Sequence, residues 1–275
     1  MTDNQPIGII AGAGRIPLIA ARLAAKSGRR VFGVQLKETG QQSLAPLCVE
    51  AATIGIGQPA AMFDFWRRHQ VTEVVLIGKV DKRLNFAEIQ FDELALQMLT
   101  RLPQKADGSW FSLISDEMDR QGVKILKQTE VLAELLVPEG HLAGPAPTAE
   151  IQADVRRGFQ VASTLAAFDI GQTIVLKNGT IIAVEAFEHT DATIQRAGKM
   201  ARGRLVVIKV ARPQQDERFD VPVIGTQTLT SMRRAGAHCL AIEAASTIMV
   251  DAGRLRAYAD KHGITLLGVK RESGG

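Results

Sequence analysis

Residues 7–28 read I-G-I-I-A-G-A-G-R-I-P-L-I-A-A-R-L-A-A-K-S-G. Their apolar start, Ile7 to Ala11, is typical of a buried strand. The glycine turn Gly12-Ala13-Gly14-Arg15 then leads into a helix predicted from about Ile16 to Ser27, with Gly28 at its end. A strand, a tight turn and a helix in this order indicate that the chain opens with a parallel sheet flanked by helices.

The same alternation of elements continues through the first half of the chain. Short β-branched runs predict further strands, and longer apolar segments predict helices between them. The predicted strands are Val31–Val34, Val49–Ile54, Glu73–Ile77 and Val123–Leu126, and the helices are Pro59–His69, Phe86–Leu99, one from Trp110 and one near Val131–Leu136. We therefore expect a Rossmann-like N-terminal domain, with helices on both faces of a parallel sheet, over residues 1–136.

Three prolines and two glycines are concentrated in Val137 to Ala149, which we interpret as a linker (137–149). Beyond it, a helix is predicted from Ala149 to Phe168, and Asn178-Gly179 predicts a hairpin between two β-branched runs. Strands and helices then alternate to the C-terminus. The chain is thus expected to be an α/β protein of two domains, with a mixed α/β C-terminal domain over residues 150–275 that carries the chemistry.

Composition narrows the class of protein. Of the 275 residues, 46% are apolar and 23% charged, with a net charge of +4, which is typical of globular proteins. The cations are scattered, so we expect no nucleic-acid partner. Cys48 and Cys239 lack metal-type spacing and predict reduced thiols in a cytoplasmic protein. No secretory signal and no spanning helix are expected, but a peripheral membrane contact stays open.

The polar stretch Lys209 to Gly225, K-V-A-R-P-Q-Q-D-E-R-F-D-V-P-V-I-G, lies between two predicted strands. If the segment is extended, Asp216, Arg218 and Asp220 share one face. Two acids on one face can bind Mg²⁺, while Arg218 and Lys209 can contact phosphate oxygens. The alternative is a solvated loop with internal ion pairs.

Two other stretches carry candidate ligand groups near the first sheet. The turn Gly12 to Arg15 follows a strand, where backbone amides can approach a phosphate, but its spacing does not match the dinucleotide fingerprint G-x-G-x-x-G. A nicotinamide cofactor is therefore disfavoured, and a nucleotide or sugar phosphate and a simple tight turn both stay open. Lys79 and Asp81 also follow a predicted strand, and they are either ligand contacts or part of a capping loop.

A third candidate stretch runs from Glu185 to Asp191. Thr190 or Asp191 could cap the following helix, or bind a ligand or metal. His189 beside Glu188 could act as a base, or the two could form a surface pair. The common motifs of serine hydrolases, zinc proteases, dithiol redox proteins and P-loop proteins are absent from the sequence. The remaining candidate residues are acids, cations and glycine turns, which suit charge stabilisation during transfer of a phosphoryl group to water.

Three segments together resemble a known family. Ile9 to Pro17 (I-I-A-G-A-G-R-I-P), Val184 to Asp191 (V-E-A-F-E-H-T-D) and especially Gln215 to Gly225 (Q-D-E-R-F-D-V-P-V-I-G) are similar to the UDP-2,3-diacylglucosamine pyrophosphatases of the LpxI type, which act in lipid A assembly in some Gram-negative bacteria. The resemblance spans both halves of the chain.

The resemblance implies a Mg²⁺-dependent hydrolase that cleaves UDP-2,3-diacylglucosamine to 2,3-diacylglucosamine 1-phosphate (lipid X) and UMP, with the lipid between the two domains. It places the essential aspartate on Asp220. On this basis we expect catalytic roles for Asp220, Asp216, Arg218 and Lys209, and metal ligation by Asp220, Asp216 and Glu185. The residues expected to bind substrate are Gly12, Ala13, Gly14, Arg15, Lys79, Asp81, Thr190, Asp191 and Gln215.

A diacylated substrate needs apolar cover, because each buried methylene contributes about 0.8 kcal/mol. Phe86 to Met98 and Trp110 to Met118 could line a lipid groove or touch the cytoplasmic face of the inner membrane, or they could simply be core. The alternative functions are a non-catalytic binding protein for nucleotide sugars or lipid phosphates and an NAD(P)-dependent oxidoreductase. A homodimer is compatible with the sequence.

Overall fold

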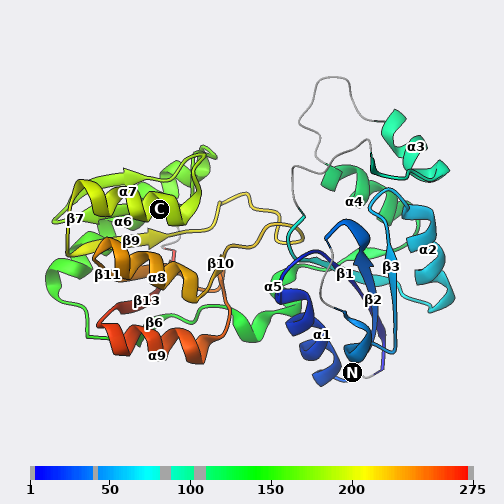
Figure 1. Ribbon diagram of the computed structural model, residues 1–275, viewed down its shortest axis with the longest axis horizontal. Coiled ribbons are helices and arrows are strands. Elements are labelled where there is room, and N and C mark those ends of the chain that lie inside the picture. The colour runs from blue at the N-terminus through cyan, green and yellow to red at the C-terminus, as the bar shows by residue number, and fades with distance from the viewer. Residues whose placement is uncertain (1–3, 40–42, 81–87, 102–109, 272–275) are drawn as a thin grey trace. The chain divides into compact units, whose positions relative to one another are not determined.

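A computed structural model describes residues 4–39, 43–80, 88–101 and 110–271 (Figure 1). The chain forms two compact units. The first consists of residues 1–132 together with Glu217–Phe219, and the second of residues 133–216 and 220–275. Among the described helices, none combines the length and the apolar character needed to cross a membrane.

The first unit is built on a parallel sheet with the strand order β3-β2-β1-β4-β5, which confirms the predicted Rossmann-like arrangement (Figure 1). Its strands are β1 (Pro6–Ala11), β2 (Arg30–Leu36), β3 (Glu50–Ile54), β4 (Glu73–Ile77) and β5 (Lys124–Ile125). Its helices are α1 (Ile16–Lys26), α2 (Pro59–Arg68), α3 (Glu93–Thr100), α4 (Trp110–Arg120) and α5 (Gln128–Val131), with 3-10 turns at Lys37–Thr39 and Ala45–Leu47.

The core of the first unit contains side chains from both the sheet and its helices. Phe63 and Trp66 of α2 and Met118 of α4 are buried against alternate residues of the strands. Phe219 is partly buried against the same cluster, although it lies far along the sequence. This contact explains why the tripeptide Glu217–Phe219 belongs to the first unit.

The second unit has a mixed six-stranded sheet in the order β6-β13-β11-β9-β7-β8. Strands β9, β11 and β13 are parallel, whereas β6, β7 and β8 pair antiparallel. The strands are β6 (Gly140–Ala143), β7 (Thr173–Lys177), β8 (Thr180–Val184), β9 (Leu205–Lys209), β11 (Ala237–Glu243) and β13 (Thr265–Val269), and β10 (Val223–Ile224) pairs separately with β12 (Ile248–Met249). The helices are α6 (Ala149–Ala167), α7 (His189–Met200), α8 (Thr226–Ala235) and α9 (Ala252–His262), with a 3-10 turn at Ala133–Leu135.

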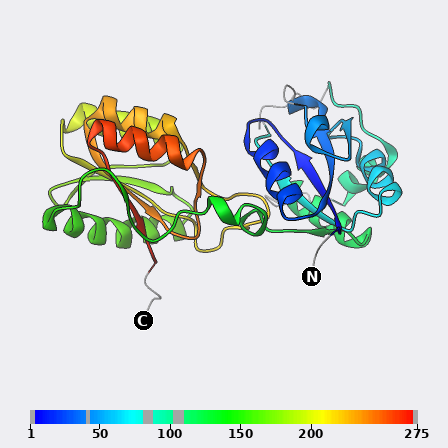
Figure 2. The same cartoon turned by 90° about the horizontal axis from the view of Figure 1, so that it is seen from below.

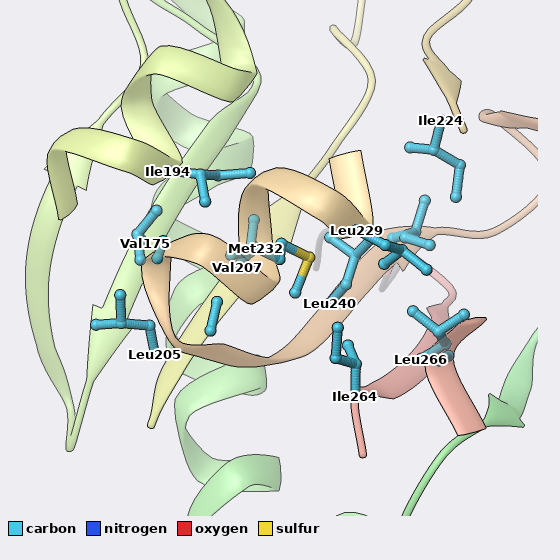
Figure 3. Packing of buried hydrophobic residues seen from close by; sticks show 14 of the residues in the cluster. Val175, Ile194, Leu205, Val207, Ile224, Leu229, Met232, Leu240, Ile264 and Leu266 are labelled. Atoms are coloured by element: carbon cyan, nitrogen blue, oxygen red, sulfur yellow. The ribbon is translucent and has the colours of Figure 1, made fainter. Parts of the chain in front are cut away.

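Helices cover both faces of this second sheet. Figure 2 shows the green helix α6 on one side of the sheet and the orange and red helices α8 and α9 on the other. Ile194 of α7 and Leu229 and Met232 of α8 are buried against one face (Figure 3). Leu255 of α9 belongs to the same cluster, whereas α6 packs on the opposite face. The sheet is therefore buried on both faces, which accounts for the run of apolar residues in β9.

Residues 137–149, predicted as a linker, instead contribute strand β6 to the edge of the second sheet. Gly140 begins this short strand, and the prolines and Gly144 lie beside it rather than in an open connection. Gly144 has φ +75°, and a β-carbon there would lie 2.0 Å from the carbonyl oxygen of Ile264. The glycine thus allows close approach to a neighbouring segment, and proline is compatible with an edge strand.

Candidate functional site

Polar side chains from three adjacent strands of the second unit meet at one edge of its sheet. Thr173, the first residue of β7, pairs in register with Lys209, the last residue of β9. Glu185 follows β8, and its backbone N–H donates to the carbonyl oxygen of Thr173 over 2.8 Å. The strand register therefore brings Thr173, Glu185 and Lys209 together.

The hydroxyl of Thr190, in the first turn of α7, connects these residues. Lys209 Nζ donates to Thr190 Oγ1 over 2.8 Å, and Thr190 Oγ1 donates to Glu185 Oε1 over 3.1 Å. Because a hydroxyl has a single hydrogen, the 3.2 Å contact with Thr173 Oγ1 is then donated by Thr173. Lys209 and Glu185 are only 7% and 9% exposed, so this network lies largely out of water.

The Lys209 ammonium interacts electrostatically with three carboxylates, which do not pair with it directly in the described part of the chain. The pKa of Lys209 is lowered, because burial disfavours the charged ammonium by more than the attraction of Glu185, Asp191 and Asp220 favours it. We refer to Glu185, Thr190, Asp191, Lys209 and Asp220 as the lysine–acid cluster. The sequence had predicted each of these residues as a site residue, and the structure brings them into one electrostatic group.

Two buried carboxylate oxygens of the cluster have no hydrogen-bond partner in the described part of the chain. They are Glu185 Oε2 and Asp191 Oδ1. The other oxygen of Asp191 accepts a 3.0 Å hydrogen bond from Gln227 at the start of α8, a contact that sequence reasoning missed. Because a buried acceptor without a donor is costly, these oxygens suit a bound cation or a hydrogen-bond donor of a ligand.

The segment from Arg212 to Asp220 turns back on itself and is not extended as predicted. The N–H of Asp220 donates to the carbonyl oxygen of Asp216 over 3.1 Å. Gln215 closes the turn, because its side-chain oxygen accepts from the N–H of Arg212 over 3.0 Å and its amide donates to the carbonyl oxygen of Asp220. Both ends of the Gln215 amide are therefore engaged within the loop.

Arg218 and Asp220 consequently belong to different surroundings. Glu217–Phe219 lies in the first unit, where Gln128 donates its backbone N–H to the carbonyl oxygen of Glu217 over 2.8 Å, and the Arg218 guanidinium lies 5.1 Å from the centre of the Phe219 ring. The extended segment on which a shared face of Asp216, Arg218 and Asp220 depended does not form, because the chain turns between them.

The cation beside Asp220 is Arg212, which sequence reasoning did not select. Arg212 Nη1 donates to Asp220 Oδ2 over 3.2 Å, and Arg212 Nε lies 2.7 Å from Asp169 Oδ1. The loop begins at a fixed point, since the N–H of Ala211 donates to Glu243 Oε2 over 2.8 Å. Only the proximity of Arg212 to Lys209 in the sequence, three positions apart, could have indicated this placement.

The expected metal trio of Asp220, Asp216 and Glu185 does not form. Within the described residues, no three His, Cys, Asp or Glu side chains meet in a group that could hold a metal ion. Asp216 is exposed and contributes its backbone carbonyl to the turn, whereas Asp191 joins Glu185 and Asp220 around Lys209.

Glu188, which could have assisted His189 as a base or formed a surface pair with it, contacts other groups among the described residues. Glu188 instead accepts hydrogen bonds from the Arg196 guanidinium and from the N–H of Ala186. Hydrogen bonding from its own backbone N–H and from Arg196 lowers the pKa of Glu188 to about 2. Glu188 is therefore ionised at neutral pH and paired with an arginine, which does not suit it to activate His189.

The candidates of the first unit lie where β1 and β4 end. Ala13 and Lys79 exchange two backbone hydrogen bonds: the N–H of Ala13 donates to the carbonyl oxygen of Lys79 over 2.8 Å, and the N–H of Lys79 donates to the carbonyl oxygen of Ala13 over 3.0 Å. The N–H of Gly12 donates to the carbonyl oxygen of Ile77 over 2.8 Å. These amides hold the two loops together instead of facing a ligand. Gly14 has φ +101° with open space beside it, and it precedes Arg15 at the start of α1. Asp81 lies outside the described residues.

The apolar segments expected either to contact lipid or to be core are partly buried, and Phe86 lies outside the described residues. Ala95 and Met98 of α3 and Met118 of α4 are buried, while Leu96 is exposed. In the second unit, by contrast, Phe168, Ile170 and Phe187 are exposed. The two loops that carry them touch, because a β-carbon at Gly171 would lie 2.0 Å from the carbonyl oxygen of Glu185. These three side chains therefore lie on the loops that adjoin the lysine–acid cluster.

The fold and the cluster together define a two-domain α/β protein with an acidic site around a buried lysine. Family models describe both parts: the LpxI N-terminal domain matches residues 6–135 and the LpxI C-terminal domain matches residues 138–267. The chain belongs to the LpxI family. It is 32% identical to the UDP-2,3-diacylglucosamine pyrophosphatase LpxI of Caulobacter vibrioides, over 96% of this chain and 98% of that protein.

Similarity to solved structures is much weaker. The chain is 14% identical to the biotin carboxylase domain of a single-chain bacterial carboxylase, with a TM-score of 0.28, over 62% of this chain and 35% of that structure. It is 13% identical to glycinamide-RNase-transformylase T from Mycobacterium tuberculosis, with a TM-score of 0.26, over 68% of this chain and 45% of that structure. Resemblances of this size carry no functional argument.

Proposed function

We propose that this protein hydrolyses the pyrophosphate bond of UDP-2,3-diacylglucosamine, which yields 2,3-diacylglucosamine 1-phosphate and UMP. The observation that carries the proposal is the lysine–acid cluster, which has open carboxylate oxygens, in a chain related over nearly its full length to a pyrophosphatase of that name. Hydrolysis of a diphosphate needs groups that orient water and neutralise charge, and it needs no covalent nucleophile.

The residues of the cluster have different chemical roles in this proposal. Lys209 is buried and donates to Thr190, so it offsets the charge of the surrounding acids and fixes the position of Glu185. The side chain of Asp220 is 62% exposed and can reach a substrate or a water molecule. Asp220 is thus the acid best suited to accept a proton from the attacking water.

Mg²⁺ is the proposed cofactor, and the open oxygens are suited to it. Mg²⁺ commonly takes one or two protein carboxylates and completes its shell with water and substrate phosphate, so a trio of protein acids is not required. Glu185 and Asp191 would hold the ion, because each has a buried oxygen without a donor, and Asp220 is the third acid nearby. Bound Mg²⁺ would neutralise negative charge on the diphosphate.

The lipid part of the substrate requires apolar contacts. The exposed side chains of Phe168, Ile170 and Phe187 adjoin the cluster and support a contact with the acyl chains of the substrate. The same lipid character supports a peripheral association with the inner membrane, because acyl chains gain free energy when a bilayer buries their methylenes.

Incubation of the purified protein with UDP-2,3-diacylglucosamine, with Mg²⁺ or with EDTA, tests the proposal through release of UMP. Asp220→Asn should lower turnover by roughly 10²-fold or more while substrate still binds, because general-base catalysis contributes about 10²–10⁴-fold. Asp216→Asn is the matched control, since this exposed acid lies outside the cluster. Intact substrate under both conditions would refute the proposed reaction, and a Mg²⁺-independent reaction would refute the cofactor.

A further inference from the structure

Arg212 lies between two carboxylates at the rim of the lysine–acid cluster. Its Nη1 donates to Asp220 Oδ2 over 3.2 Å and its Nε lies 2.7 Å from Asp169 Oδ1. The carboxylates belong to different segments, since Asp169 follows α6 and Asp220 ends the loop after β9. Arg212 is therefore held by two separate parts of the second unit.

The position of Arg212 distinguishes it from the other candidate cations. Lys209 is buried and donates to Thr190, and Arg218 lies in the tripeptide of the first unit. The side chain of Arg212 is 39% exposed, and its carboxylate partners are 74% and 62% exposed. Ion pairs as exposed as these are weak, so a ligand with a higher negative charge can displace the carboxylates.

We propose that Arg212 binds a phosphate group of the substrate, and that Asp169 and Asp220 hold the guanidinium in position until the substrate arrives. The planar guanidinium can contact two phosphate oxygens at once, which a lysine ammonium cannot do. Transfer of Arg212 from Asp220 to the phosphate also frees the Asp220 carboxylate to contact water. This role rests on the proposed function. It identifies Arg212 as the residue that recognises the diphosphate, and it makes the phosphate compete with Asp220 for the guanidinium.

This competition predicts that substitutions of Arg212 and of Asp169 change the affinity for phosphate in opposite directions. Arg212→Gln removes charge-assisted hydrogen bonds to phosphate and should weaken binding roughly 10- to 100-fold. Asp169→Asn removes an acid that competes with phosphate and should tighten binding about two- to fivefold. The second substitution suits the backbone, because Asp169 has φ +57° and asparagine tolerates this region well.

Titration calorimetry with inorganic pyrophosphate, in the presence of Mg²⁺, measures these changes without turnover. Arg212→Lys should bind with intermediate affinity, since it keeps the charge and loses the planar fork. Arg204→Gln is the matched control: Arg204 also forms an exposed ion pair, with Glu150 at 3.6 Å, but it precedes β9 whereas Arg212 follows it. The control should bind pyrophosphate as the unmodified protein does.

The outcomes separate this inference from the proposed function. Pyrophosphate binding that depends on Arg212 supports the inference even if UDP-2,3-diacylglucosamine is not cleaved. Cleavage with an unchanged KM and unchanged pyrophosphate affinity in Arg212→Gln would overturn the inference and leave the proposed function intact. If Arg212→Gln does not fold, Asp169→Asn decides, because unchanged or weaker pyrophosphate binding in that variant contradicts the competition.

Discussion

Replacement of Lys209 by methionine tests whether the buried ammonium stabilises the acids around it. Methionine is close to lysine in length and removes the charge. In the variant, Glu185 stays 9% exposed but loses the cation that shares the Thr190 hydroxyl with it. Removal of the cation from this hydroxyl-bridged pair is destabilising, because the buried carboxylate charge that remains is not compensated.

The size of the effect follows from the geometry. Lys209 Nζ and Glu185 Oε1 both bond Thr190 Oγ1, at 2.8 and 3.1 Å, so they are at most about 6 Å apart. At an effective dielectric constant of about 20, two unit charges at this distance attract with about 3 kcal/mol. We therefore expect Lys209→Met to lower the free energy of unfolding of the second unit by at most about 3 kcal/mol, because removal of the ammonium also relieves its burial cost.

Hydrogen exchange measured by mass spectrometry can locate this loss. Amides of β7 and β9 should exchange up to roughly a hundredfold faster in the variant, while amides of β1 and β4 keep their rates and serve as the internal control. Glu185→Gln in the Lys209→Met background should restore most of the protection, because glutamine can still accept from Thr190 and carries no charge. Equal protection in the single and double variants would refute the electrostatic reasoning.

Two further perturbations follow from other features of the fold. Gly171→Ala should destabilise the second unit by about 1–3 kcal/mol in urea unfolding and reduce activity, because its β-carbon would lie 2.0 Å from the Glu185 carbonyl oxygen. Gly253→Ala in α9 is the control: this glycine has open space around it, so the variant should be as stable as the unmodified protein or slightly more stable. Equal effects of the two substitutions would contradict this packing argument. Burial raises the pKa of Cys48 to about 11 and that of Cys239 to about 12. Both thiols should therefore react slowly with iodoacetamide at pH 8 and rapidly in urea. Rapid labelling of the folded protein would contradict the burial.

Local signals in the sequence were sufficient to predict most of the fold. The Asn178-Gly179 pair predicted the β7–β8 hairpin, and both residues have the positive φ angles, 49° and 76°, that such a turn requires. Strand β4 matches its predicted limits, because Gly78 and the charged residues after it end the apolar run. The linker prediction failed, since four residues at a sheet edge carry little apolar signal between prolines.

The site was harder to predict, because the direction of a loop does not follow from its composition. Most members of the lysine–acid cluster could be chosen from the sequence, since Glu185, Thr190, Asp191 and Lys209 lie at a strand end or a helix start. Asp220 lies within a loop, and its polar stretch and the resemblance to a known family indicated it. The sequence could not show that the chain turns between Asp216 and Asp220, so Arg218 was predicted in place of Arg212. Glycine-turn amides are likewise ambiguous: Gly12 and Ala13 donate to the neighbouring strand end, a pairing between segments far apart in sequence.

The tripeptide Glu217–Phe219 makes the first unit discontinuous in sequence. A fragment that ends at Leu132 lacks the Phe219 ring from its core and the carbonyl partner of the Gln128 N–H. Halves cut at the boundary between the two family domains are therefore not self-sufficient, and chimaeras between relatives need the tripeptide to come from the same parent as residues 1–132. A change in these three residues thus affects a core whose other side chains come from roughly a hundred positions or more earlier in the sequence.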